Sequence, residues 1–159
     1  MLSRAADLPE SPENPLGEPS FLQESQLIDV RFDALRSTVG LLLELRTAMH
    51  LSIGVAAAIV ARNVYEVSWR ADRATERVAW AVIGAECSSK DGIVEMAVFF
   101  SPSASLLIRA EFVEFYNLDV VGLSEEIPDY VEDDEVVIRA NTASWESVIT
   151  PLAASFISS

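Results

Sequence analysis

The sequence offers few side chains that could catalyse a reaction. It contains one histidine, His50, and one cysteine, Cys87. A Ser-His-Asp or Cys-His arrangement would have to use His50, and no nucleophile-elbow pattern surrounds it. Zinc ligation needs more histidine and cysteine than the chain has, and there is neither a P-loop nor a GxGxxG motif. We therefore predict a protein that is not an enzyme and that needs no cofactor and no metal.

Carboxylates are the one abundant reactive group. A pair of carboxylic side chains can hydrolyse glycosides without a histidine. The chain has 25 acidic residues, and their spacing does not single out one pair. An enzyme that works with carboxylates alone is thus the least favoured class of function.

The densest cluster of acidic side chains lies in residues 124–135, called the acidic segment below, which hold seven acids and no base. The acids are Glu125, Glu126, Asp129, Glu132, Asp133, Asp134 and Glu135, and Tyr130 lies among them. One interpretation is a solvated loop that leads into a helix, because acids favour helix N-termini. The other is a docking surface for a basic protein, with Tyr130 as an aromatic anchor. Calcium binding is less favoured, because the alternating ligands and central glycine of an EF-hand loop are missing.

The charge of the whole chain also favours a basic partner. The net charge is −14, to which the acidic segment contributes −7, residues 1–25 contribute −4 and residues 26–123 contribute −3. Binding to nucleic acid needs a basic surface and is not expected. The longest apolar run, residues 51–61, is shorter than the ~20 residues that cross a bilayer, and no signal-peptide pattern is present. We predict a cytoplasmic protein that does not bind membranes, and the sequence leaves open whether it forms homo-oligomers.

Two tryptophans offer a different kind of site. Trp69 and Trp80 lie in strand-like runs and could line the cavity of a small-ligand-binding β-barrel. Aromatic residues also favour strands as ordinary core residues. A ligand-binding barrel is therefore the alternative to protein docking.

Residues 77–116 carry the clearest structural pattern and predict three antiparallel strands. Apolar residues recur at every second position over residues 92–100 and 106–112, which is the period of a half-buried strand. A shorter alternation over residues 78–83 precedes them. Asp91-Gly92 is typical of a hairpin turn, and Ser101-Pro102-Ser103 of a second turn.

Further strands are expected before this meander. Alternation over residues 28–34 and 41–46 predicts a hairpin. Residues 34–49 also fit helical spacing, but Gly40 in the middle counts against a helix. Residues 55–69 predict one long strand, or two strands joined at a bulge near Asn63.

The C-terminal part predicts one short helix and a closing strand. Asp133 or Asp134 would cap the helix, with Val136, Val137 and Ala140 facing the core. An apolar pattern over residues 145–157 indicates the strand, and Pro151 places it at an edge or a bulge.

Together these elements predict a mainly β protein, an antiparallel meander that forms a barrel or a curved sandwich, with one short helix near the C-terminus. Residues 26–159 would form a single domain. Residues 1–25 hold four of the seven prolines and five acids, which predicts a flexible, disordered extension. Phe21 and Leu22 could pin the end of this extension to the domain.

Three short runs carry a resemblance to known proteins. They are residues 30–40 (VRFDALRSTVG), 67–69 (VSW) and 128–130 (PDY). In these runs, and in general pattern over most of residues 27–157, the chain resembles small, acidic, uncharacterised bacterial proteins of the immunity-protein type from polymorphic toxin systems. The resemblance implies a protein that binds and blocks a toxin, often a basic nuclease. No catalytic motif accompanies it.

We therefore predict a non-catalytic binding protein that recognises a basic protein partner. The acidic segment would speed association, and charged pairs would set the register of the complex. Neutralising Glu132, Asp133, Asp134 and Glu135 is expected to weaken binding.

Overall fold

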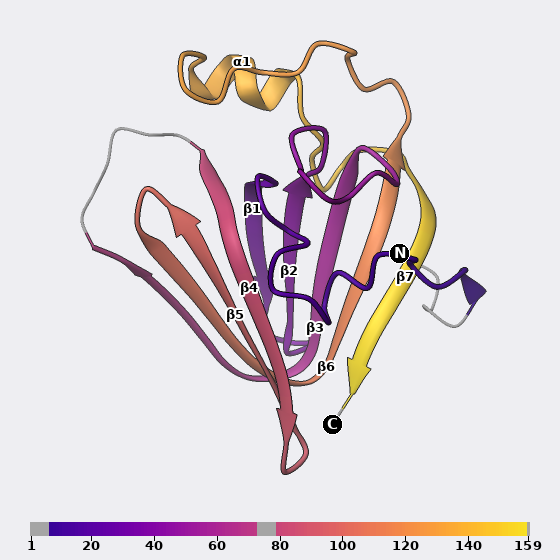
Figure 1. The fold of residues 1–159 in the computed structure, drawn as a ribbon, viewed down its shortest axis with the longest axis vertical. Helices are drawn as coiled ribbons and strands as arrows, with labels where there is room; N and C mark the ends of the chain where they lie inside the picture. Colours follow the sequence, from indigo (N-terminus) through magenta and orange to yellow (C-terminus); the bar gives the residue numbers. More distant parts are fainter. Residues whose placement is uncertain (1–6, 73–78, 159) are drawn as a thin grey trace.

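The computed structural model describes residues 7–72 and 79–158, which form seven antiparallel strands and one short helix (Figure 1). The strands are β1 (Gln26–Asp33), β2 (Thr38–Glu44), β3 (Ala56–Ala71), β4 (Trp80–Lys90), β5 (Ile93–Ser101), β6 (Ala104–Val120) and β7 (Ile149–Ser158). The helix, α1 (Glu135–Ala140), precedes β7. The predicted fold class is confirmed, because the protein is mainly β, its sheet curves into a ring, and its short helix lies near the C-terminus.

Six of the strands close the ring in the order β3-β2-β1-β4-β5-β6, with β6 pairing back onto β3. The chain builds this ring from two three-stranded meanders, β1–β2–β3 and β4–β5–β6. Two seams join the meanders. β3 and β6 pair along nearly their whole lengths, whereas the described parts of β1 and β4 pair at Gln26–Ala81 and Leu27–Trp80. β7 pairs with the second half of β6 and lies outside the ring.

Local sequence explains the turns of the two meanders. β4 and β5 are joined by Asp91 and Gly92, which have φ values of 54° and 80°. Two positive φ values are typical of a type I′ turn, which suits the right-handed twist of a hairpin and which Asp-Gly adopts readily. The predicted hairpin of β1 and β2 is confirmed, so the helical alternative for residues 34–49 is wrong.

β3 and β6 are long strands that bend together. Asn63 has a φ of 52°, and the register between the two strands shifts between Val64 and Glu66. A bulge of this kind bends a strand and increases its twist, and both strands curve strongly in Figure 1. β3 is therefore one long strand, as the first alternative predicted, and it contains the bulge near Asn63 that the second alternative predicted. Simple alternation places Phe112 with the core residues of β6, but beyond the bend its side chain is 41% exposed.

The interior of the ring is filled by apolar side chains from all six of its strands. Examples are Leu27, Leu41, Ile59, Val82, Met96 and Ile108, all buried. β5 shows the predicted alternation most clearly, because Val94, Met96, Val98 and Phe100 are buried while their neighbours are half-buried or exposed. Period-two patterning thus places one face of each strand in a common core.

A second apolar cluster lies on the opposite face of β2, β3 and β6. Leu42, Ala58 and Tyr116 are buried there, with Trp145 packed against them. Trp145 lies over Gly40 so closely that a Cβ atom at position 40 would be 2.8 Å from the Trp145 ring. Gly40 is therefore needed in a strand because the tryptophan occupies the space of a side chain.

Replacing Gly40 with valine should lower the free energy of unfolding by about 1–3 kcal/mol, because the new side chain overlaps Trp145. Denaturant unfolding of the variant measures this loss. The same substitution in a Trp145→Ala background should cost less than in the wild type. An equal cost in both backgrounds would show that the tryptophan is not the cause.

Residues 7–25 pack against the ring instead of extending away from it. Leu16 and Leu22 are buried in the core of the ring, so the expected pinning by Leu22 is confirmed. Hydrogen bonds tie the segment to β7 (Ser11 N to Ala154 O, 2.9 Å) and to β4 (Glu24 N to Val82 O, 2.9 Å). The domain accordingly includes residues before the predicted boundary at residue 26. Residues 1–6 of the predicted extension lie outside the described part of the chain.

α1 begins where the sequence predicts, because the Asp134 side chain accepts a hydrogen bond from Val137 N and caps the helix. Its buried residue is Ile138, whereas Val136 is 76% exposed. The prediction that Val136, Val137 and Ala140 face inward is wrong, because a six-residue helix is too short for its apolar period to be read. No helix in the described residues is long and apolar enough to cross a membrane.

Candidate functional site

The acidic segment belongs to the connection between β6 and β7, which crosses one end of the ring together with α1 (Figure 1). Six of its seven acidic residues are exposed, and Asp133 is half-buried. The segment is attached to the ring at a buried ion pair. This attachment fixes the ends of the backbone stretch that carries the acidic side chains.

The ion pair consists of Arg46, just after β2, and Glu44, at the end of β2. Arg46 Nε and Nη2 donate to the two oxygens of the Glu44 carboxylate, each at 2.8 Å. The Glu44 side chain is 1% exposed and the Arg46 side chain 11%. The hydrogen bonds that Arg46 donates to the Glu44 carboxylate raise the pKa of Arg46. A bidentate pair of this kind satisfies the buried charges.

The remaining N–H groups of Arg46 bind the connection that carries the acidic segment. Nη1 donates to Ser124 O (2.7 Å), and Nη2 donates to Asn141 O (2.6 Å). One guanidinium therefore holds the start of the acidic segment and the end of α1. The sequence analysis did not predict this role of Arg46. The signal was present, because Glu44 and Arg46 lie in and directly after the apolar run Leu41–Leu45, and a charge that is buried needs a partner.

Tyr130 lies on the inner side of the acidic segment. Its side chain is half-buried, and its hydroxyl oxygen is buried without a hydrogen-bond partner among the described residues. Burial, together with the nearby Glu44 carboxylate, raises the pKa of Tyr130. Tyr130, which we expected as an aromatic anchor for a partner, thus has its hydroxyl buried near the Glu44–Arg46 ion pair.

The acidic side chains fall into two groups. Four of them stabilise the local fold. Asp129 accepts from Val131 N and Glu132 N, Asp133 accepts from Asp129 N, Asp134 caps α1, and Glu135 pairs with Arg139. Such bonds are the usual use of aspartate in turns and caps. Glu125, Glu126 and Glu132 are exposed, and their carboxylates make no hydrogen bond or ion pair within the described chain, so they are the members best placed to meet a partner.

Exposed aliphatic side chains alternate with these acids. Ile127 is 50% exposed, Val131 69% and Val136 76%. Apolar residues surrounded by charged ones are typical of protein interaction surfaces. Exposed acidic and exposed aliphatic side chains therefore lie next to one another along this connection.

At the second predicted site, the side chains of Trp69 and Trp80 pack against each other. The two indoles meet edge to face with centroids 5.3 Å apart, and Trp69 also lies 5.5 Å from the ring of Phe100. Trp69 is 44% exposed. These contacts make the tryptophans an aromatic cluster where β3 ends and β4 begins, and they do not favour the small-ligand alternative.

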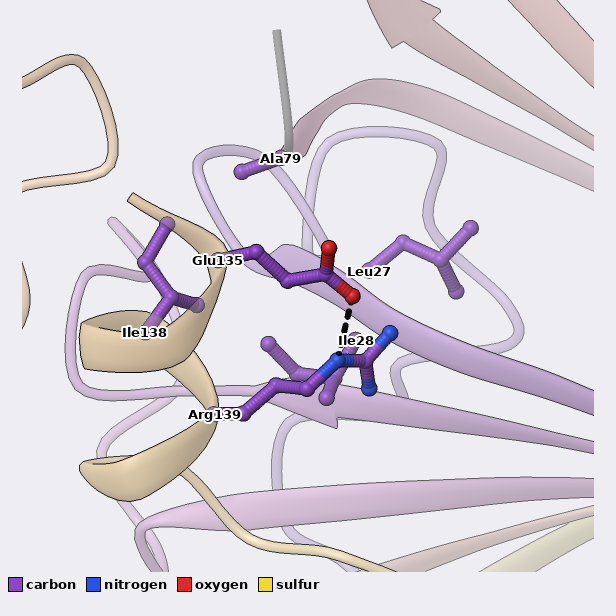
Figure 2. Close-up of a pocket in the computed structure, with 6 residues that line it drawn as sticks. All are labelled: Leu27, Ile28, Ala79, Glu135, Ile138 and Arg139. Atoms are coloured by element: carbon purple, nitrogen blue, oxygen red, sulfur yellow. Dashed lines mark hydrogen bonds and ion pairs between the residues drawn. The ribbon is translucent and has the colours of Figure 1, made fainter. Parts of the chain in front are cut away.

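A cavity of about 190 Å³ lies between α1, the strand β1 and Ala79, the residue before β4 (Figure 2). Its lining combines four apolar residues, Leu27, Ile28, Ala79 and Ile138, with the charged residues Glu135 and Arg139. The carboxylate of Glu135 and the guanidinium of Arg139 point toward each other at its edge, 2.8 Å apart. The cavity is smaller than the roughly 300–1,000 Å³ of typical ligand sites, and its charged groups are already paired with each other.

His50 and Cys87, the remaining candidates for reactive side chains, belong to neither the acidic segment nor the tryptophan cluster. His50 contacts the ring of Phe21 at a centroid distance of 6.3 Å. Burial raises the pKa of the Cys87 thiol to about 11, so the reactive thiolate is scarce at neutral pH. Within residues 7–72 and 79–158, no three histidine, cysteine or acidic residues are grouped to hold a metal ion.

Comparison with known proteins leaves the chain without a family assignment. No protein-family model, curated protein or solved structure matches the chain. The resemblance to immunity proteins therefore stays a prediction.

Proposed function

We propose that the protein is a non-catalytic binding protein whose acidic segment docks onto the basic surface of a protein partner. A toxin neutralised by an immunity protein is one form that such a partner would take. The observation that carries the proposal is the anchored position of Glu125, Glu126 and Glu132, which are exposed beside aliphatic residues on a segment held by Arg46. Acidic side chains in fixed positions accelerate association and align the partners.

The test compares two variants with the same change in charge. The first replaces Glu125, Glu126 and Glu132 with glutamine, which spares the aspartates that stabilise the segment. The second replaces Glu18, Glu24 and Glu86, which are exposed acids elsewhere on the described surface. A partner is first isolated from the native host by affinity capture, and the Kd of the purified pair is then measured at several salt concentrations.

We expect the first variant to bind about ten-fold more weakly than the wild type, since each exposed pair contributes up to about 1 kcal/mol. Its affinity should also depend less on salt. The second variant should lose much less affinity. Equal losses in both variants would mean that only the total charge matters and that the acidic segment is not the docking surface.

A further inference from the structure

β7 is an edge strand, paired with β6 on one side only. The backbone N–H and C=O of Ala154 point away from β6. The N–H donates to Pro9 O and the C=O accepts from Ser11 N, both at 2.9 Å. Backbone groups repeat their direction every two residues along a strand. The register of β7 is regular from Ala153 to Ser158, so the N–H and C=O of Phe156 also point away from β6.

The N-terminal segment covers only one position of this edge. It forms a single parallel bridge between Glu10 and Ala154, where the N-terminal segment and β7 lie side by side in Figure 1. Pro9 has no N–H with which to continue the pairing toward the start of β7. In the other direction, Ser11 O accepts from Asn14 N in a turn (3.4 Å), whereas a continued ladder would have Phe156 N donate to Ser11 O. The segment therefore leaves Phe156 unpaired on this side.

The bridge also buries polar groups that have no partner. Ser11 is 3% exposed and Ser155 is 8% exposed, and neither hydroxyl oxygen has a hydrogen-bond partner among the described residues. Buried hydroxyl groups without partners oppose the docking of the segment. A competing strand that forms more backbone hydrogen bonds with β7 could thus displace residues 9–11.

The edge beyond the bridge lacks the usual protection of edge strands. Natural edges are blocked by lysine, proline or inward-pointing charges, but residues 152–158 contain none of these. Phe156 is 65% exposed and Phe112 41% exposed, and they share one face of the sheet because Phe156 pairs with Glu114, two residues from Phe112. At this end of β7, Ser89 Oγ also donates a hydrogen bond to Ser158 O (3.3 Å).

We propose that the edge of β7 from Ala154 to Ser158 is a second docking surface, which takes an extended, proline-free segment of a protein partner. The segment would pair in parallel with β7, in the direction of residues 9–11, and would place an apolar side chain against Phe112 and Phe156. Strand addition of this kind takes its affinity from backbone hydrogen bonds. The occupant is a different protein and not a second copy, because a net charge of −14 opposes self-association. The inference is independent of the acidic segment.

The test uses the full chain and, as a probe, a short capped peptide of alternating threonine and valine with a lysine at each end. Binding should slow the hydrogen exchange of the Phe156 amide, followed by NMR. Phe156→Pro removes the amide that only the incoming strand uses, whereas Phe156→Ala removes the same side chain and keeps the amide. We expect the peptide to bind Phe156→Pro about ten-fold more weakly than Phe156→Ala. The variant with glutamine at positions 125, 126 and 132 should show the same protection of Phe156 as the wild type.

A copy of the peptide methylated at alternate backbone nitrogens supplies an independent measurement on the wild type, should Phe156→Pro fail to fold. It should not protect Phe156. Equal binding of the methylated and unmethylated peptides, or no protection of Phe156 by either, would overturn the proposal. A wild type that is dimeric by light scattering, with a Phe156 amide protected without peptide, would show that a second copy occupies the edge and would overturn the choice of partner.

Discussion

Replacing Arg46 with methionine should lower the free energy of unfolding by about 3–5 kcal/mol, which is the usual cost of removing one partner from a buried ion pair. The variant leaves the Glu44 carboxylate, 1% exposed, without its bidentate partner. It also removes the donors that bind Ser124 O and Asn141 O. Denaturant unfolding measures the loss of stability, and amide hydrogen exchange over residues 124–141 should rise in the folded protein.

Two further variants separate the buried charge from other effects. Arg36→Met removes an exposed arginine that lies 3.9 Å from Asp33, and it should change stability by less than about 1 kcal/mol. Replacing Glu44 with leucine together with Arg46→Met removes both buried charges and should recover much of the stability. If Arg46→Met costs no more than Arg36→Met, the ion pair is not the anchor of the acidic segment.

The same variant bears on function. Arg46→Met makes the chain more negative, so a mechanism based on total charge predicts tighter binding to a basic partner. A mechanism that needs the acids in fixed positions predicts weaker binding. The sign of the change in Kd therefore distinguishes the two mechanisms.

Replacing Leu22 with alanine should lower the free energy of unfolding by about 2–5 kcal/mol, as for other leucines that fill a core. Leu22 is fully buried in the ring although it lies in a proline-rich, acidic segment. Leu35→Ala is the matched control, because Leu35 is 100% exposed, and it should change stability by no more than about 0.5 kcal/mol. The midpoints and slopes of urea unfolding curves measure both changes. Similar curves for Leu22→Ala and the wild type would mean that residues 7–25 are dispensable for the fold.

The strands were predictable from sequence because each has a local signal. Period-two alternation marks β5 and β6, and Asp91-Gly92 marks the turn before β5. The choice of a hairpin over a helix for residues 34–49 depended on Gly40, and the structure adds a reason that sequence could not supply, since Gly40 makes room for Trp145. That contact joins residues more than a hundred positions apart.

The role of the N-terminal segment was harder to predict. Its composition is typical of disorder, but Leu16 and Leu22 enter the core without any period that would reveal them. The charge of the acidic segment revealed it in the sequence, but nothing in the sequence revealed how the segment is attached to the ring of strands. Arg46 meets backbone carbonyls of Ser124 and Asn141, and any residue type supplies a carbonyl, so no sequence pattern marks these partners.

The two seams of the ring have a consequence for how fast the protein folds. Each meander forms from strands that are neighbours in sequence, with turns as short as Asp91-Gly92. The β3–β6 seam instead joins residues up to 62 positions apart, such as Ala56 and Leu118. Loop closure over such separations costs entropy before any contact forms, and proteins rich in distant contacts fold slowly. We therefore expect the joining of the two three-stranded meanders, rather than the formation of either one, to be the slow step of folding.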